Sequence, residues 1–221
     1  ATTLIDTSQD KADQGRAHTD TLLQAHVAKG VLGAEAAHAT LSLITATTDM
    51  AALAGCELVI EAVFENRALK ATITQAAEPH LTAGGVMASN TSTLPIAGLA
   101  QASKDATQFV GIHCFSPVHK MKLVEIIKGQ ATSAASLDQA REFVSQIDKQ
   151  SLTVSNIPGF ATSRLDLIAS LEAMRMLESG VASAEDIDRA AVLAYQHPVG
   201  PLRLSDIVGL DVRLDIARTL E

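Results

Sequence analysis

The segment LVIEAVFENRALKATITQAAEPHLTAGGVMASN, residues 58–90, indicates the fold class of the chain. It begins with an apolar, β-branched run, Leu58–Val63, which is typical of a buried strand. Residues 66–81 have the pattern of a helix, and the Gly84-Gly85 turn leads into a second apolar run over 86–90. A strand, a helix and a second strand in this order predict a βαβ unit, whose two strands lie parallel in one sheet.

The alternation of strands and helices continues on both sides of this unit. A short strand is predicted over 2–6, and a long helical segment follows over 8–29. The elements predicted downstream are strands over 109–115, 123–127 and 152–155, and a helix over 136–149. This order predicts an α/β domain with a mainly parallel sheet.

The pattern changes after Pro158-Gly159, where helix periodicity replaces strand signals. Ser183 and Asp186 form a plausible capping box at the start of one helix. The predicted helices cover 160–179, 183–194 and 205–220, with a rigid turn, HPVGP, over 197–201. We therefore predict a sheet domain over 1–157 and a helical domain over 158–221.

The composition excludes several classes of protein. The chain has 221 residues, 47% of them hydrophobic, which is enough for a packed core. Its formal charge of −8 and its lack of Trp disfavour nucleic acid as a partner. Two cysteines do not make a disulfide framework or a metal cluster, and no apolar run approaches the ~20 residues of a membrane span. We expect a soluble intracellular protein that binds no nucleic acid and no metal.

Asp6 follows the first predicted strand and is a candidate cofactor contact. In a dinucleotide-binding unit, an acid at this place accepts hydrogen bonds from the adenosine ribose, and it favours NAD over NADP. Asp6 is an equally good cap for the following helix. The GxGxxG turn expected about 20 residues earlier is missing, and its nearest approach is Gly30-Val31-Leu32-Gly33. Either the fold is a different one, or the chain begins after the first strand and turn.

His113 and Glu125 lie in two apolar strands and are candidate catalytic residues. A lone His in such a strand is more often a core residue than a catalyst. However, a carboxylate in Leu123–Ile127 is costly to bury without a partner, and a His on a neighbouring strand is a good one. Such a pair fixes the imidazole tautomer and favours its protonated form, which suits a general base that takes an alcohol proton.

Two further polar groups follow strands. The run Ser89–Pro95 offers short side chains that can bind a sugar, amide or carbonyl, or cap a helix. A second polar group, at the end of the 58–63 strand, consists of Glu61, Glu65, Asn66 and Lys70. The simpler interpretation of Lys70 is an ordinary surface pair on its helix.

Six stretches together resemble one known family. They are LVIEAVFEN (58–66), ASNTSTLPI (88–96), GIHCFSPVHKMKLVEII (111–127), PGFATSR (158–164), EDID (185–188) and HPVGPLRLSDIVGL (197–210). The chain resembles the NAD-dependent L-3-hydroxyacyl-CoA dehydrogenases, including the 3-hydroxybutyryl-CoA dehydrogenases. The resemblance looks strongest to the dehydrogenase part of multifunctional fatty-acid oxidation enzymes.

The resemblance implies a role for each matching residue. His113 matches the catalytic base, Glu125 its orienting partner, and Ser92 the serine that binds the substrate oxygen. The positions that it implies for the NAD cofactor are Asp6, Glu65, Lys70, Asn90, Ser92 and Ser116. Ser163 completes the implied catalytic group, although Ser163 and Ser116 both stand where many relatives have Asn.

The resemblance also implies an α/β, Rossmann-like NAD-binding domain, followed by a helical domain that builds much of a homodimer interface. The implied reaction interconverts a short-chain L-3-hydroxyacyl-CoA and its 3-ketoacyl-CoA in fatty-acid metabolism, in the cytoplasm or else the mitochondrial matrix. Relatives extend beyond both ends of the chain, so we expect the first strand, the Gly-rich turn and a C-terminal tail to be missing.

Two alternatives stay open. A non-catalytic acyl-CoA-binding or dimerisation module would keep the fold without the cofactor turn. A dehydrogenase of free hydroxy acids usually carries a lysine on the first helix of its second domain, and 158–177 contains none.

Overall fold

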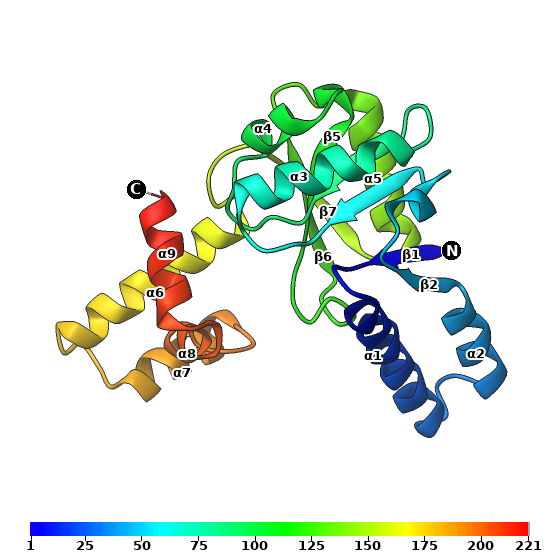
Figure 1. Ribbon diagram of the computed structural model, residues 1–221. Helices are drawn as coiled ribbons and strands as arrows, with labels where there is room; N and C mark the ends of the chain where they lie inside the picture. The colour runs from blue at the N-terminus through cyan, green and yellow to red at the C-terminus, as the bar shows by residue number, and fades with distance from the viewer. Residues whose placement is uncertain (221) are drawn as a thin grey trace.

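The computed structural model describes residues 1–220, so Glu221, the end of the predicted helical domain, lies outside the described residues. Figure 1 shows a sheet-containing part and a group of helices, α6 to α9, which are connected through the start of α6. The helices α1 and α2 project from the sheet-containing part on the side of the N-terminus (Figure 1). The architecture is the predicted one, an α/β domain followed by helices.

The strands are β1 (Thr2–Ile5), β2 (Ile44–Thr47), β3 (Leu58–Glu61), β4 (Val86–Ser89), β5 (Phe109–Cys114), β6 (Leu123–Lys128) and β7 (Gln150–Ser155). The α-helices are α1 (Gln9–Ala28), α2 (Ala34–Ser42), α3 (Arg67–Ala77), α4 (Ile96–Leu99), α5 (Ala134–Gln146), α6 (Thr162–Glu178), α7 (Ala184–Tyr195), α8 (Pro201–Val208) and α9 (Leu210–Leu220). Short 3₁₀ turns cover Met50–Leu53, Glu78–His80, Ala100–Ala102 and Ala106–Gln108.

The strands form two sheets. β1 and β2 pair in parallel, and β3-β4-β5-β6-β7 form a second sheet in that order. The second sheet is mainly parallel, as predicted, but β5 and β6 are antiparallel. The loop over 115–122 that joins them is too short for the helical crossover that a parallel pair needs. This antiparallel pair brings the two candidate catalytic strands side by side.

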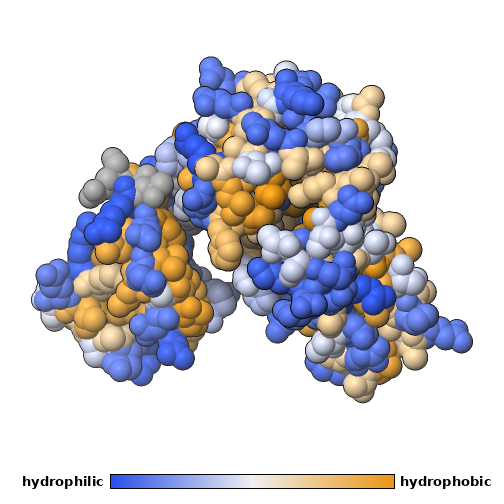
Figure 2. Space-filling model, in the orientation of Figure 1, coloured by the Kyte–Doolittle hydropathy of each residue, from blue (hydrophilic) through white to orange (hydrophobic). Residues whose placement is uncertain are grey.

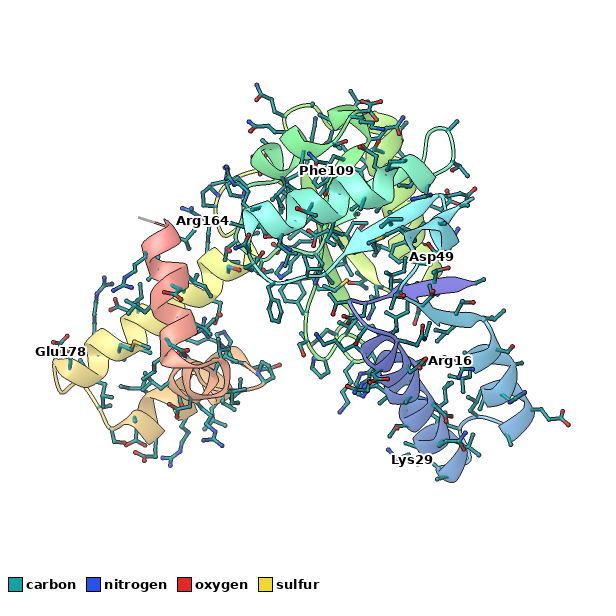
Figure 3. The ribbon with its side chains drawn as sticks, in the orientation of Figure 1. Arg16, Lys29, Asp49, Phe109, Arg164 and Glu178 are labelled. Carbon is teal, nitrogen blue, oxygen red and sulfur yellow. The ribbon has the colours of Figure 1, made fainter. Side chains whose placement is uncertain are left out.

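Both faces of the five-stranded sheet are covered. On one face, Leu137 and Val144 of α5 pack against strand residues such as Val110. On the other face, Ile96 packs in a cluster with Phe109, which is 1% exposed and is labelled in Figure 3. Burial on both faces explains why these strands are continuous apolar runs rather than alternating ones.

Side-chain caps fix the starts of two helices. Ser8 accepts a hydrogen bond from the amide of Lys11 and is the N-cap of α1. Asp6 instead accepts from the amide of Thr7, so the alternative in which it caps this helix is wrong. Asn66 caps α3, and the α-helix ends at Ala77 rather than at 81, because a 3₁₀ turn that contains a proline follows.

The segment 34–47 contains α2 and β2, two elements that the sequence pattern does not predict. Both elements are short. Ala37 is the buried residue of α2. The helix therefore has almost none of the periodic apolar residues from which a helix is predicted in a sequence.

The helical part has one more helix than predicted among the described residues. The single helix expected over 205–220 is wrong, because α8 begins at Pro201 and α9 begins at Leu210. Gly209 separates them with φ of +101°, a conformation that L side chains rarely adopt. The predicted cap is confirmed, since Ser183 accepts from the amide of Asp186 at the start of α7.

Candidate active site

The antiparallel register of β5 and β6 sets His113 directly opposite Glu125. The imidazole Nδ1 lies 3.0 Å from Oε2 of the glutamate, and both side chains are buried. Because Nδ1 faces the carboxylate, Nε2 is the nitrogen available to a substrate. The structure therefore brings together the pair that the sequence predicted.

The other side of Glu125 faces the start of α6. Its Oε1 accepts hydrogen bonds from the amides of Ala161 (3.1 Å) and Thr162 (3.0 Å). Its Oε2 accepts from the Thr162 hydroxyl at 2.8 Å as well as facing His113. Burial alone would raise the pKa of Glu125, but the hydrogen bonds from His113, Thr162 and Ala161 outweigh it and lower the pKa. Glu125 is thus an ionised carboxylate in the interior.

Aromatic rings surround the imidazole. The ring centroid of Phe115 lies 4.4 Å from that of His113, and the ring centroid of Phe160 lies 6.0 Å from it. Gly159 and Phe160 both have positive φ, of +74° and +50°. A left-handed conformation at Phe160 is unfavourable for a bulky residue. This turn brings the first amides of α6 onto Glu125 and a ring beside His113.

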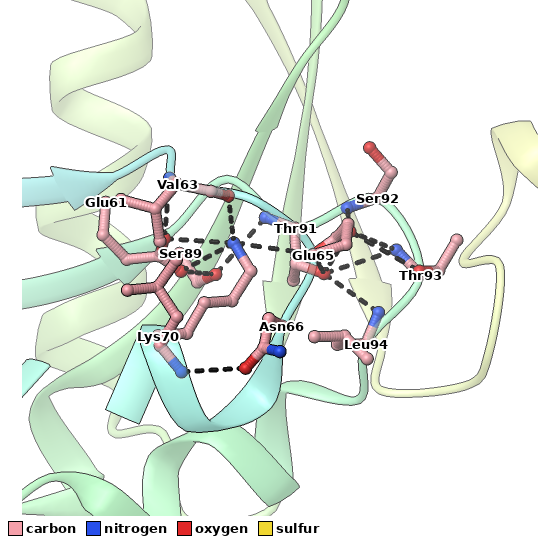
Figure 4. Close-up of polar contacts among 11 residues, drawn as sticks. Glu61, Val63, Glu65, Asn66, Lys70, Ser89, Thr91, Ser92, Thr93 and Leu94 are labelled. Atoms are coloured by element: carbon pink, nitrogen blue, oxygen red, sulfur yellow. Dashed lines mark hydrogen bonds and ion pairs between the residues drawn. The ribbon is translucent and has the colours of Figure 1, made fainter. Parts of the chain in front are cut away.

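A second buried ion pair lies at the carboxyl end of β3 (Figure 4). Lys70 Nζ lies 3.1 and 3.0 Å from the two oxygens of Glu61, 3.1 Å from the carbonyl oxygen of Val63 and 3.5 Å from Glu65. Lys70 is 2% exposed. The simpler interpretation of Lys70 as an ordinary surface pair is therefore wrong. Ser89, at the end of β4, also donates to Glu61.

Glu65 joins the loop after β3 to the loop after β4. Its Oε1 accepts from the amide of Ser92 at 2.7 Å, and the Thr91 hydroxyl donates to the same carboxylate at 2.8 Å. Figure 4 shows the Ser92 hydroxyl directed away from Glu65, and among the described residues it has no hydrogen-bond partner. The alternative in which a side chain of Ser89–Pro95 caps a helix is wrong, because the N-cap of the following helix, α4, is Pro95, which has no side-chain cap hydrogen bond.

The remaining predicted residues lie at different places. Asn90 accepts a hydrogen bond from the amide of Cys114 at 2.8 Å, so it joins β4 to β5 beside His113. Asp6 is exposed at the end of β1, and Ser116 is exposed in the loop after β5. Ser163 is half-buried in the first turn of α6, and within the described chain its hydroxyl has no hydrogen-bond partner.

Two residues of the site had no predicted role. Thr162 contacts Glu125, and Lys149 donates to the carbonyl oxygens of Val118 and Met121, both at 2.6 Å. Lys149 thereby holds the loop that follows β5, the strand of His113. Thr162 lies in the stretch PGFATSR, which carries part of the family resemblance, but nothing in the sequence assigned its hydroxyl a role, and no pattern pointed to Lys149.

The described residues contain no helix long and apolar enough to cross a membrane. Across 1–220, no cluster of three His, Cys, Asp or Glu side chains is arranged to hold a metal ion.

Comparisons with known proteins agree along the chain. Residues 1–157 match the NAD-binding domain of 3-hydroxyacyl-CoA dehydrogenases, and residues 159–221 match their C-terminal domain. A 3-hydroxybutyryl-CoA dehydrogenase of Bradyrhizobium diazoefficiens is 38% identical over 98% of this chain and 74% of that protein. The mitochondrial hydroxyacyl-coenzyme A dehydrogenase of Sus scrofa is 39% identical over 81% of this chain and 57% of that protein.

A solved structure of (S)-3-hydroxybutyryl-CoA dehydrogenase from Ralstonia eutropha has a TM-score of 0.94 and 34% identity. The match covers 99% of this chain and 77% of that one. The chain belongs to the 3-hydroxyacyl-CoA dehydrogenase family.

Proposed function

We propose that the chain is an NAD-dependent 3-hydroxyacyl-CoA dehydrogenase that interconverts a short-chain L-3-hydroxyacyl-CoA, such as 3-hydroxybutyryl-CoA, and its 3-ketoacyl-CoA. The observation that supports this most is the buried His113–Glu125 pair, with Nδ1 and Oε2 3.0 Å apart. An ionised carboxylate on Nδ1 keeps Nε2 unprotonated in the neutral ring, which is the state that a general base needs.

In the oxidation, Nε2 of His113 takes the proton of the C3 hydroxyl while a hydride leaves C3, and the C3–O bond becomes a carbonyl. Glu125 stabilises the imidazolium that results. The free hydroxyl of Ser92 holds the substrate oxygen, and Ser163 supplies a second hydroxyl from α6. In the reduction each step runs in reverse.

NAD, when bound, accepts the hydride from C3. The candidate residues around it are Asp6, Glu65, Lys70, Asn90, Ser92 and Ser116, of which Lys70 is buried and would act by holding Glu61 and Glu65 rather than by contact with NAD. The exposed carboxylate of Asp6 after β1 fits the adenosine ribose hydroxyls and disfavours an added phosphate. Glu65 fits as a residue that shapes the loop around Ser92, since it already binds that amide.

We assign cofactor binding to residues 1–157, and substrate binding and dimerisation to residues 158–221. The exposed large apolar residues of the helical part include Leu165, Ile168, Leu193, Tyr195, Ile207 and Leu210. Figure 2 shows hydrophobic side chains gathered over these helices. Such a surface supports a homodimer, which light scattering would show as twice the mass of the chain. A monomer at micromolar concentration would refute it.

We place the enzyme in the cytoplasm, with the mitochondrial matrix as the alternative.

Oxidation of NADH by acetoacetyl-CoA tests the reaction. His113→Ala should lower turnover by about 10²–10⁴-fold, while NADH binding, followed by its fluorescence, should remain. Near-normal turnover of this variant would refute the role of His113. A wild-type protein that binds acetoacetyl-CoA but shows no saturable NADH binding would favour the non-catalytic acyl-CoA module instead.

A further inference from the structure

The carboxylate of Glu125, on β6, accepts hydrogen bonds from the helical part of the chain. Three donors at the start of α6 contact it: the amides of Ala161 and Thr162 on Oε1, and the Thr162 hydroxyl on Oε2. The helix has no side-chain cap of its own, since its N-cap is Ala161. Glu125 therefore caps α6 from β6, and the helix in turn fixes the carboxylate.

The Thr162 hydroxyl differs from the two amides in the oxygen that it contacts. It donates to Oε2, the oxygen that also faces Nδ1 of His113. With Oε1 held by two amides and Oε2 by one hydroxyl, rotation about the last bond of the side chain is blocked in both directions. By donating to Oε2, the hydroxyl also stabilises the negative charge on the oxygen that faces the imidazole.

We propose that Thr162 is a positioning residue for the reaction, whose hydroxyl holds Glu125 in the one orientation that presents Oε2 to His113. The inference rests on the proposed role of His113 as the base. The helical part would then orient the catalytic pair directly, in addition to any contact that it makes with the substrate.

The substitution that tests this is Thr162→Val, which removes the hydroxyl and preserves the shape of the side chain. Thr162→Ser is the matched control, because it keeps the hydroxyl and removes only a methyl group. Thr162→Ala removes the hydroxyl in a smaller side chain, and it replaces the valine variant if that variant does not fold. Each variant is first checked by circular dichroism and thermal unfolding.

Loss of one hydrogen bond to a charged group that orients the base should lower kcat about tenfold. The KM for NAD should stay within about twofold, because Thr162 lies in the helical part and not at the ends of β1, β3 or β4. Without the Thr162 hydroxyl, Glu125 presents Oε2 to His113 less steadily, so the imidazolium is stabilised less. The acidic limb of the kcat/KM profile for oxidation should therefore move to lower pH.

Other charged groups near the pair do not obscure this profile. Burial raises the pKa of the neighbouring Cys114 thiol, and the charge of Lys149 only partly offsets this, so the thiol stays neutral over the acidic limb. On α6, Arg164 donates to the carbonyl oxygen of Pro158, and Asp166 pairs with Arg213. None of these contacts is altered by the three variants.

The proposal is supported if Thr162→Val lowers kcat and shifts the acidic limb while Thr162→Ser retains wild-type behaviour. It is overturned if the valine variant matches the wild type in both, or if serine and valine are equally impaired, since a methyl contact would then explain the effect. An inactive wild-type protein would instead refute the proposed function, so the two failures are distinguishable.

Discussion

Replacement of Glu125 by glutamine tests the catalytic pair with the least change in shape. Oε1 accepts from two amides of α6, so the amide oxygen of the introduced glutamine must take this position. The opposite orientation would set its NH₂ group against two N–H donors. The NH₂ group therefore occupies the place of Oε2, opposite Nδ1 of His113 at 3.0 Å.

An NH₂ group at that place reverses the hydrogen bond to the imidazole. Nδ1 must then accept, so the neutral ring carries its proton on Nε2 and cannot take another from the substrate. The charge that stabilises the imidazolium is lost as well. A comparable carboxylate-to-amide change in the serine protease triad costs about 10⁴-fold in kcat. We expect a fall of about 10³–10⁴-fold in Glu125→Gln, equivalent to about 4–5.5 kcal/mol of activation free energy.

The assay is the initial rate of NADH oxidation by acetoacetyl-CoA at saturating concentrations of both. The NADH dissociation constant, measured by fluorescence titration, should change by less than about threefold, because the cofactor residues at the ends of β3 and β4 are untouched. Glu142→Gln, on the exposed side of α5, is the matched control. If Glu125→Gln kept more than a tenth of wild-type kcat, the carboxylate would not set the tautomer of His113, and the reasoning would fail.

Two further predictions concern stability. Lys70→Met leaves the buried carboxylate of Glu61 without its cation, so urea unfolding should show a loss of about 3–5 kcal/mol. Lys122→Met, which breaks an exposed pair with Asp148, should leave the free energy of unfolding almost unchanged, and equal losses in the two variants would contradict the account. Because the pKa of Glu125 is lowered in the folded state, its contribution to stability is complete above the ordinary glutamate pKa of about 4.3 and disappears as the pH falls through the lowered value. The unfolding free energy of Glu125→Gln should therefore decline less between pH 5 and pH 3 than that of the wild type, and parallel declines would count against it.

The catalytic pair could be predicted because an unpaired charge is costly to bury. Glu125 lies inside an apolar strand, and the desolvation of a carboxylate demands a partner within reach. His113 lies in the preceding strand, close enough along the chain for a direct pairing. The order of strands and helices likewise follows from apolar periodicity. These predictions depend on local patterns and on one strong energetic penalty.

Lys70 shows where this reasoning fails. Its neighbours on the helix suggested a surface pair, but the side chain is directed at the end of β3, where Glu61 is its main partner. The direction of a long side chain depends on how α3 packs on the sheet, which periodicity does not determine. The division of the last helix at Gly209 has the same origin, since one residue at positive φ separates two segments of similar pattern.

The contact between Glu125 and α6 could not be predicted from the sequence either, although it helps to explain why position 125 is a glutamate. A buried carboxylate has about four sites that accept hydrogen bonds, and His113 uses one of them. The amides of Ala161 and Thr162 and the Thr162 hydroxyl use three others. A glutamine could not accept all four hydrogen bonds, because its NH₂ group, in the place of Oε2, would donate towards the Thr162 hydroxyl and Nδ1 of His113. The ionised carboxylate that the base requires is therefore also the group that accepts all three donors at the start of α6, and these hydrogen bonds join β6 to the helical part.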